Sequence, residues 1–578
     1  MALFALWRGD AGAARALRRD AHVVAEREVS RTVATPRGEW HLSAFATASR
    51  FHAADAQFWF GEDEACVFHG VAWRHRDGRA DLLDARAWAA LCDGPGRALP
   101  PDVHGEYVVA RVHRCGTVEA FGDPAGIGQI FHLPGRDDAI ANRAAFVARL
   151  AGRREADAGS AAWIAAVGYR LGTRTGWAGV RQLPQGARWV NARLATGERV
   201  GPEPGAARGF DLALLEQGMA EAAAAMALAE TDGAIPLPVT GGKDSRALVA
   251  IAAHAGLRDR LDLFTRGRPE HPDVIVGAQI AATLGLPHRR EEPVQPGGDA
   301  RWPAERLVKE LARLAFQTDG GMGGWDLVTG RQPGQSTQVT GHMGELLRPY
   351  AKRLLPADGD PVALVHAQGP FDPLDILRPA ARRRLVATLH DELGRLATED
   401  DETGALPDLF YLRHRIPNWL GGVRAVKSFE RQPLAPLGVR SLTTLAFRMT
   451  AGERRRDLAH YRIVERGAPE LLALPFAHQR WDAELPGAPD VAPILAPADL
   501  PLFGSWQFSI NEPDVRARLA TLFSTPLALW EEVDRVRVLR HLRETRFDTF
   551  AGISLLGLVV SVLHGAGLAR PDRIGGAW

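Results

Sequence analysis

A short glycine-containing turn in the middle of the chain has the residue types of a phosphate-binding site. The sequence Thr-Gly-Gly-Lys-Asp-Ser at 240–245 separates an apolar run at 235–239 from an alanine-rich segment at 245–254. The apolar run predicts a buried strand, and the alanine-rich segment predicts a helix. A strand-to-helix turn presents free backbone N–H groups and a helix N-terminus to an anion. We therefore expect this turn to hold phosphate groups, with an ordinary ligand-free turn as the alternative.

The turn does not match the Walker-type phosphate loop. That loop requires a serine or threonine directly after its lysine, and here Asp244 follows Lys243. The two glycines still suit phosphate binding, because a residue without a side chain lets the backbone approach the phosphates closely.

The elements around the turn predict two differently built regions. Between residues 40 and 195, short β-like runs are separated by turn residues, which predicts antiparallel sheet. Residues 196–209 are polar and rich in glycine and proline, as in a linker. Helix (212–230), strand (261–265) and helix (273–284) then alternate. This alternation predicts a parallel sheet, with ligands at the carboxyl ends of its strands.

Composition sets the broad class. A chain of 578 residues exceeds a single hydrophobic core, and we expect domains at 1–205 and 206–578. The net charge of +1 gives no basic excess for nucleic acid. Three cysteines without metal spacing and the lack of a signal-like start favour the cytoplasm. The apolar run at 553–563 has only 11 residues, which predicts a buried helix rather than a membrane span.

Three segments together resemble the class B asparagine synthetase superfamily. The turn at 240–245 is similar to the S/T-G-G-x-D-S loop of the N-type ATP pyrophosphatases. The segment "FTRGRPEHPDVIVGAQIAATLGLPHR" (264–289) resembles that superfamily's G-x-P-x-x-P-D turn, helix and L-G-x-x-H. The segment "QVTGHMGELLRP" (338–349) stands where the family has S-G-x-G-x-D-E.

The resemblance implies a set of ligand-binding residues. Asp244 and Glu345 would hold Mg²⁺, with Glu345 one methylene longer than the family's aspartate. The alternative for Glu345 is an acid favoured by the dipole at a helix N-terminus. The other residues that the resemblance places around the ATP phosphates are Thr240, Gly241, Gly242, Ser245 and Gly341.

The N-terminal region is similar to the family's glutaminase domain, through "GEYVVARVHRCGTVEAFGDPAGIGQIFH" at 105–132. The implied fold is α/β: a glutaminase-like (Ntn) antiparallel sandwich, followed by an adenine-nucleotide α-hydrolase-like (PP-loop) parallel-sheet domain with a helical C-terminal part. A working glutaminase of this family uses an N-terminal cysteine as nucleophile. Here Ala2 follows Met1, and no cysteine lies nearby in the sequence (Cys66, Cys92, Cys115). We therefore expect no ammonia release from glutamine.

Three residues are candidates for catalysis. His342 stands where relatives carry Glu or Tyr and is expected to be the general base, or alternatively only a hydrogen-bonding residue of the turn. Arg480 would replace the family's late lysine, although an arginine is not a simple substitute for lysine. Lys243 would add positive charge beside the phosphates or face solvent.

The resemblance implies an ATP- and Mg²⁺-dependent carbon–nitrogen ligase that releases AMP and pyrophosphate. The first choice is an intramolecular cyclisation, such as lasso-peptide macrolactam formation on a precursor peptide supplied with leader-binding and peptidase proteins. The alternatives are an ammonia-dependent asparagine synthetase, a β-lactam-type synthetase, a tRNA-modifying pyrophosphatase or a non-catalytic binding module. Segments 408–419 and 428–436 resemble those that shape the family's acceptor site, and the glycine-rich stretch 319–326 is either part of that site or a surface turn. We expect no nucleic-acid or membrane partner.

Overall fold

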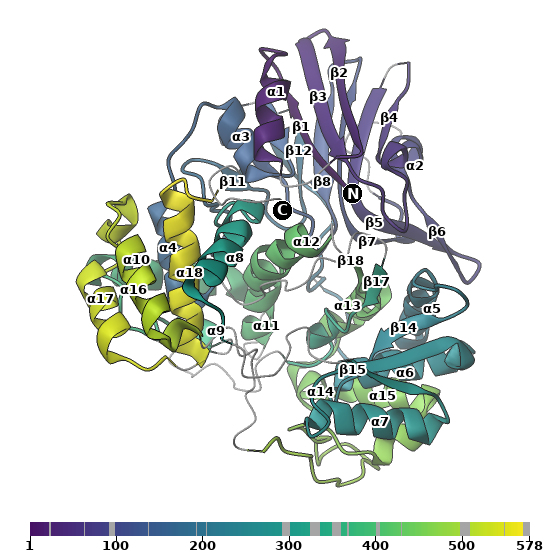
Figure 1. Ribbon diagram of the computed structural model, residues 1–578. Helices are drawn as coiled ribbons and strands as arrows, with labels where there is room; N and C mark the ends of the chain where they lie inside the picture. Colours follow the sequence, from purple (N-terminus) through teal and green to yellow (C-terminus); the bar gives the residue numbers. More distant parts are fainter. Residues whose placement is uncertain are drawn as a thin grey trace.

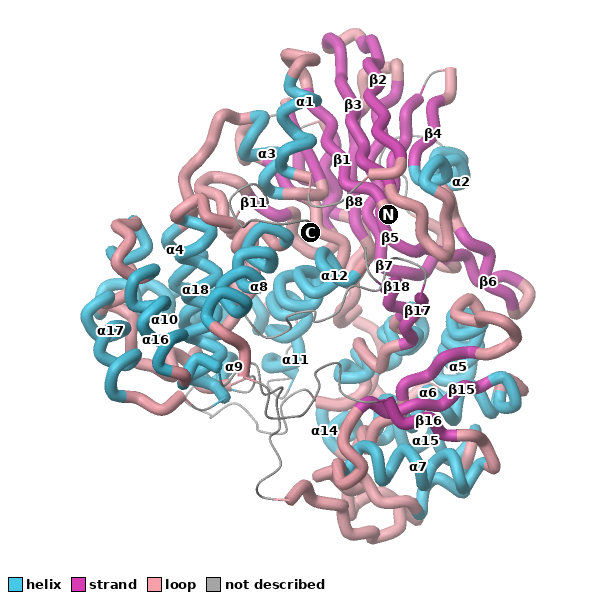
Figure 2. Tube along the Cα trace, viewed as in Figure 1, coloured by secondary structure: helices cyan, strands magenta, loops and turns pink. Residues whose placement is uncertain are grey.

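The computed structural model describes the chain except for residues 22–24, 63, 92–98, 137, 192, 204, 292–300, 324–335, 350–359, 367–368, 400–404, 429–430, 498–508, 548 and 570–578. It is a mixed α/β structure with two antiparallel sheets and a parallel arrangement of strands (Figures 1 and 2).

The two antiparallel sheets are built from the N-terminal third of the chain. The first has the strand order β11 (Arg181–Gln182), β9 (Phe131–His132), β10 (Ala139–Ala141), β1 (Ala2–Trp7), β3 (Gly38–Ala46) and β2 (Arg27–Thr35). The second has the order β13 (Arg193–Thr196), β12 (Ala187–Val190), β8 (Val118–Gly122), β7 (Val103–His113), β5 (Glu64–Arg76) and β4 (Phe58–Phe60), with β6 (Arg79–Leu82) also paired to β5. The sequence predicted antiparallel sheet here, and the structure confirms it.

The antiparallel sheets pack face to face and are covered by helices. One core lies between them and contains Phe4 and Leu42 from the first sheet and Val67 and Val108 from the second. Helices α1 (Ala13–Leu17) and α3 (Ala144–Leu150) cover the outer face of the first sheet, and α2 (Ala85–Leu91) covers the second. Because side chains alternate along a strand, β1 contributes to the cores on both of its faces.

The predicted parallel region is also present. Strands β14 (Ile235–Pro238), β15 (Leu261–Arg266) and β16 (His288–Glu291) form a parallel sheet, with Ile235 opposite Leu261. Strands β17 (Ser336–Val339) and β18 (Arg431–Leu434) form a second parallel pair, and β17 lies beside β14. Helices α5 (Leu212–Ala227), α6 (Lys243–His254) and α7 (Pro272–Leu284) connect or cover these strands.

The rest of the chain is helical. Its described helices are α8 (Ala304–Gln317), α9 (Ala363–His366), α10 (Pro379–Ala397), α11 (Leu406–Phe410), a π-helix (Tyr411–Leu420), α12 (Gly421–Lys427), α13 (Arg440–Arg448), α14 (Ala451–Arg455), α15 (Leu458–Gly467), α16 (Pro513–Leu522), α17 (Arg535–Glu544) and α18 (Thr549–Gly565). Residues 553–563 lie inside α18 and are buried, as predicted. Within the described ranges, no helix combines the length and apolarity needed to cross a membrane.

One helix joins the two regions that the sequence separated at residue 205. Helix α4 (Ala158–Val167) packs against α18, and the figures show the two helices side by side (Figures 1 and 2). Its residues Trp163 and Ala165 belong to the same hydrophobic core as the C-terminal helices. A cut at residue 205 would therefore expose apolar surface on both fragments.

Candidate functional site

Two loops meet at the carboxyl ends of β14 and β17. Strand β14 pairs with β15, and β17, which lies beside β14, pairs with β18. The carboxyl ends of parallel strands are where open parallel sheets bind ligands. A Cβ atom on Gly341 would lie 2.9 Å from Cβ of Asp244, and one on Gly344 would lie 2.6 Å from its Oδ1. The structure thus brings together the motifs at 240–245 and 340–345, which are about a hundred residues apart in the sequence.

The turn after β14 is held closed by its own side chains. Ser245 Oγ donates to the carbonyl of Thr240 at 3.0 Å, and the Thr240 N–H donates to Ser245 Oγ at 3.1 Å. Asp273, from the second matched segment, accepts the Gly241 N–H at 2.8 Å. Helix α6 begins after Gly242, which has no side chain to cap the N–H groups of the first turn. The turn therefore has the geometry of an anion-binding helix N-terminus.

Gly241 is required by a close approach of another segment. A Cβ atom on Gly241 would lie 2.4 Å from Cβ of Ala477 and 2.7 Å from its backbone nitrogen. We expect Gly241→Ala to lower the free energy of unfolding by about 1–3 kcal/mol, because backbone must move to relieve the overlap. Gly242→Ala is the matched control, since its Cβ would meet only Thr240 Oγ1 at 3.4 Å. Urea unfolding of both variants measures the difference, and equal stability would contradict the close approach.

The Asp244 carboxylate contacts two basic side chains, Arg348 and His460. Arg348 donates to it through Nε at 3.3 Å and an Nη at 2.9 Å, and His460 Nε2 lies 2.8 Å from Oδ1. Burial opposes ionisation of Asp244, but Arg348 and His460 outweigh it and hold the pKa of the carboxyl below its usual range. Asp244 is therefore a stable anion within the turn at 240–245.

Glu345 differs from Asp244 in having an unsatisfied oxygen. Its Oε2 is buried and has no hydrogen-bond partner. Burial and the nearby charge of Asp244 raise the pKa of Glu345 to about 7. A divalent cation bound to Asp244 and Glu345 would give this oxygen a partner and would offset the repulsion between the two carboxylates.

The donor set fits Mg²⁺ only with ligands from outside the protein. Among the residues that the structure describes, no group of three or more His, Cys, Asp or Glu side chains is arranged to hold a metal ion. Mg²⁺ commonly binds through one or two carboxylates and completes its shell with phosphate oxygens and water. Asp244 and Glu345 are sufficient for that mode.

The raised pKa of Glu345 predicts a pH-dependent stability in buffer containing EDTA. The folded chain keeps the proton up to about pH 7, whereas the unfolded chain releases it near 4.5. The stabilisation is complete below the unfolded value and is lost as the pH rises through about 7. At pH 8 we therefore expect Glu345→Gln to be more stable than the wild type, by about 1–3 kcal/mol. At pH 4.5 the difference should shrink.

Chemical denaturation at the two pH values measures the effect. Glu305→Gln on α8 removes an exposed carboxylate and should give the same small difference at both. A Glu345→Gln variant that is equally destabilised at both pH values would contradict the raised pKa.

Lys243 is buried, and the interpretation that it faces solvent is wrong. Its Nζ forms an ion pair with Asp457, and both side chains are inaccessible to solvent. The ammonium also lies 5.6 Å from the ring centre of Phe476 and 5.5 Å from that of Trp481. Lys243 thus connects the turn at 240–245 to Asp457 and to the segment around Ala477.

Arg246, one turn further along α6, anchors the same segment and was not singled out from the sequence. Its guanidinium donates to the carbonyls of Leu471 and Leu474, each at 2.9 Å, and lies 3.7 Å from the ring centre of Phe476. Arg480, in contrast, is an exposed side chain that lies 3.7 Å from Asp490.

His342 is half-buried and lies against a charged pair. An Nη of Arg424 donates to His342 Nδ1 at 3.3 Å, and Arg424 is also ion-paired with Glu106 from β7. Burial, together with the charges of Arg424 and Lys427, holds the pKa of His342 well below its usual value. With Nδ1 accepting, the neutral ring carries its proton on Nε2. His342 could accept a proton at Nδ1 only after Arg424 moves away.

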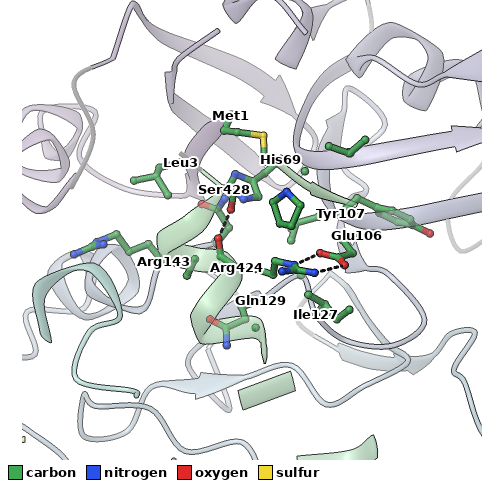
Figure 3. Close-up of a pocket in the computed structure, with 18 of the residues that line it drawn as sticks. Met1, Leu3, His69, Glu106, Tyr107, Ile127, Gln129, Arg143, Arg424 and Ser428 are labelled. Atoms are coloured by element: carbon green, nitrogen blue, oxygen red, sulfur yellow. Dashed lines mark hydrogen bonds and ion pairs between the residues drawn. The ribbon is translucent and has the colours of Figure 1, made fainter. Parts of the chain in front are cut away.

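A cavity lies where the antiparallel sheets meet α12 (Figure 3). Figure 3 shows Met1 and His69 on one side of it and the Glu106–Arg424 pair on the other. We call it the Met1 cavity. Among the residues that the structure describes, no cysteine lines this cavity: Cys66 is buried in another core and Cys115 is exposed. Cys92 and residues 324–326 of the predicted glycine-rich loop lie outside the described residues.

Several residues of the site were not predicted from the sequence. Arg348 stands three residues after Glu345 within a quoted motif, so its position was a usable signal. His460 and Asp457 lie on or next to α15, far from any quoted motif.

Comparison with known proteins gives no assignment. Neither a scan against protein-family models nor a search of curated proteins finds a match to this chain.

Proposed function

We propose that this chain is an ATP-dependent amide ligase that adenylates a carboxylate and transfers the acyl group to an amine. The observation that carries the proposal is the meeting of the two loops at Asp244. A glycine turn at a helix N-terminus and a second loop with an acid stand together at the carboxyl ends of adjacent strands. The helix–sheet–sheet–helix layering of the N-terminal region is compatible with the glutaminase-like fold that the resemblance implies.

In the first step, a substrate carboxylate oxygen attacks the α-phosphorus of ATP, and pyrophosphate leaves. The backbone N–H groups at Gly242 and the start of α6 bind the leaving phosphates, which gain charge in the transition state. Mg²⁺, when bound by Asp244 and Glu345, would neutralise part of that charge. Arg348 adds a positive charge next to Asp244.

In the second step, an amine attacks the activated carbonyl, and AMP leaves with one oxygen of the original carboxylate. The amine must lose a proton as it attacks. His342 lies in the loop at 340–345 and contacts Arg424, which is ion-paired with Glu106; we propose that His342 takes this proton once Arg424 has moved away. Because no thiol lines the Met1 cavity among the described residues, we favour an amine that belongs to the substrate, as in a peptide cyclisation.

The test uses the full chain with Mg·ATP and peptides that carry a free amino terminus and an internal Asp or Glu labelled with ¹⁸O in its carboxyl group. We expect AMP and pyrophosphate, ¹⁸O in the AMP, and a peptide lighter by one water. Release of ADP and phosphate would overturn the adenylation step. Aspartate with ammonium salts tests the asparagine synthetase alternative in the same assay.

A further inference from the structure

A second cavity separates β5 and β7 from the segment at 433–444. It has a volume of about 230 Å³, against about 70 Å³ for the Met1 cavity. The two share Glu106 and Ile127 in their walls, but Trp73 and His104 line only the second. We call it the Trp73 cavity. Met343, which follows His342, forms part of its wall.

Trp73 and His104 form a cross-strand pair with two unpaired polar atoms. They are directly opposite each other on β5 and β7, and their rings stack at 6.1 Å with an interplanar angle of 27°. Trp73 is 2% exposed and His104 is 4% exposed. Trp73 Nε1 and His104 Nε2 are both buried without a hydrogen-bond partner. Leaving two such groups unpaired is costly unless something in the cavity satisfies them.

Both unpaired atoms are donors. A tryptophan indole can only donate. The backbone N–H of Arg440 donates to His104 Nδ1 at 3.4 Å, which leaves the proton of the neutral ring on Nε2. Burial lowers the pKa of His104, so the ring stays neutral. Two donors without a hydrogen-bond partner therefore belong to paired residues in the wall of the cavity.

The residue after His104 is a glycine that lets β7 approach β5 closely. Gly105 has φ of +125°, and a Cβ atom there would lie 2.1 Å from the carbonyl oxygen of Val71 on β5. Only glycine permits this approach of the two strands.

Most charges around the cavity have an ion-pair partner. Glu106 is matched by Arg424, Glu198 lies 2.5 Å from Arg440, and Arg199 and Glu203 lie 3.6 Å and 3.7 Å from Glu399 and Arg448. The Asp123 carboxylate in the same wall accepts the backbone N–H groups of Ala125, Ile127 and Gly128. Much of the remaining wall is apolar, with Val71, Val103, Ile127, Leu434 and Val439. A net charge on a ligand would find no unmatched partner there, so the wall favours a neutral molecule.

We infer that the Trp73 cavity is a binding site for a neutral, largely apolar molecule whose carbonyl oxygen accepts hydrogen bonds from Trp73 Nε1 and His104 Nε2. An amide is the class that fits best, because its oxygen is a strong uncharged acceptor with two lone pairs. Its binding requires neither ATP nor turnover, so this inference stands or fails separately from the proposed function.

The test is ligand-observed saturation-transfer NMR on the full chain without ATP, with N-acetyl-leucinamide as the probe and N-acetyl-leucine as its charged analogue. The wild type should bind the amide, and Trp73→Phe should weaken it about tenfold, equivalent to about 1.4 kcal/mol. Trp88→Phe is the matched control: Trp88 is equally buried, also has an unpaired Nε1 and does not line the cavity. It should leave binding unchanged.

Equal binding of the amide to wild type and Trp73→Phe would overturn the inference, as would tighter binding of the acid or no binding of the amide. Should Trp73→Phe fail to fold, crystals of the wild type soaked with the amide decide the question. The expected density places the probe oxygen within hydrogen-bonding distance of Trp73 Nε1, and an amide bound elsewhere contradicts the site.

Discussion

Asp244→Asn should reduce the rate of pyrophosphate release by about 10²–10³-fold while leaving the protein folded. The substitution removes the negative charge that we propose binds Mg²⁺ next to the ATP phosphates. The amide keeps the size of the side chain and can still contact Arg348 and His460. It cannot supply an anionic ligand to a cation. The rate is measured with the labelled-peptide assay, and folding by circular dichroism and urea unfolding.

The control for this prediction is Asp262→Asn. Asp262 is an exposed carboxylate on β15, whose Oδ2 lies 3.0 Å from Arg289. Its replacement removes the same charge from β15, away from the turn at 240–245, and should leave the rate within a factor of about two. If Asp244→Asn kept more than a tenth of the wild-type rate, Asp244 would not be part of the catalytic site.

The local elements around the site could be read from the sequence because their signals are local. The predicted helix at 245–254 lies within α6, and the predicted one at 273–284 within α7. Gly285 ends α7 with φ of +66°, the left-handed conformation that a glycine after a helix favours. Hydrophobic period, proline and glycine act over a few residues, so they are visible without knowing the fold.

Other elements carried a weaker local signal. β1 is a central, doubly buried strand, but its short apolar run does not show the alternation of a strand with one exposed face. The segment at 408–419 overlaps the π-helix Tyr411–Leu420, which contains Pro417. A π-helix in the middle of a helical segment depends on tertiary packing and has no periodic pattern of its own.

The electrostatic partners of the site could not be predicted in the same way. His460 reaches Asp244 across 216 residues, and Arg424 reaches Glu106 across 318 residues. Such pairs depend on the packing of whole helices and sheets, and one sequence contains no local record of them. The sequence therefore predicts which residue types stand in the turn at 240–245. It does not predict their ionisation, because that depends on partners such as Arg348 and His460, which only the folded structure brings close.

Replacing Lys243 should have the second large effect, and its result distinguishes a structural role of this residue from a catalytic one. Lys243→Met should lower the free energy of unfolding by about 3–5 kcal/mol, because it leaves the buried Asp457 carboxylate without its partner. The double variant Lys243→Met/Asp457→Asn should recover most of that loss, since neither side chain is then charged. Asn also tolerates the left-handed backbone of position 457, where φ is +59°. Urea unfolding of the two variants and the wild type gives the comparison.

Lys309→Met on the exposed face of α8 is the control and should change stability by about 0.5 kcal/mol or less. A stable Lys243→Met protein that forms the adenylate but no amide would assign Lys243 to the second chemical step. Recovery of both stability and turnover in the double variant would instead make the ion pair a support for the phosphate turn. We expect the second outcome, because the Lys243 ammonium is buried against Asp457 and supports the turn by holding its backbone in place.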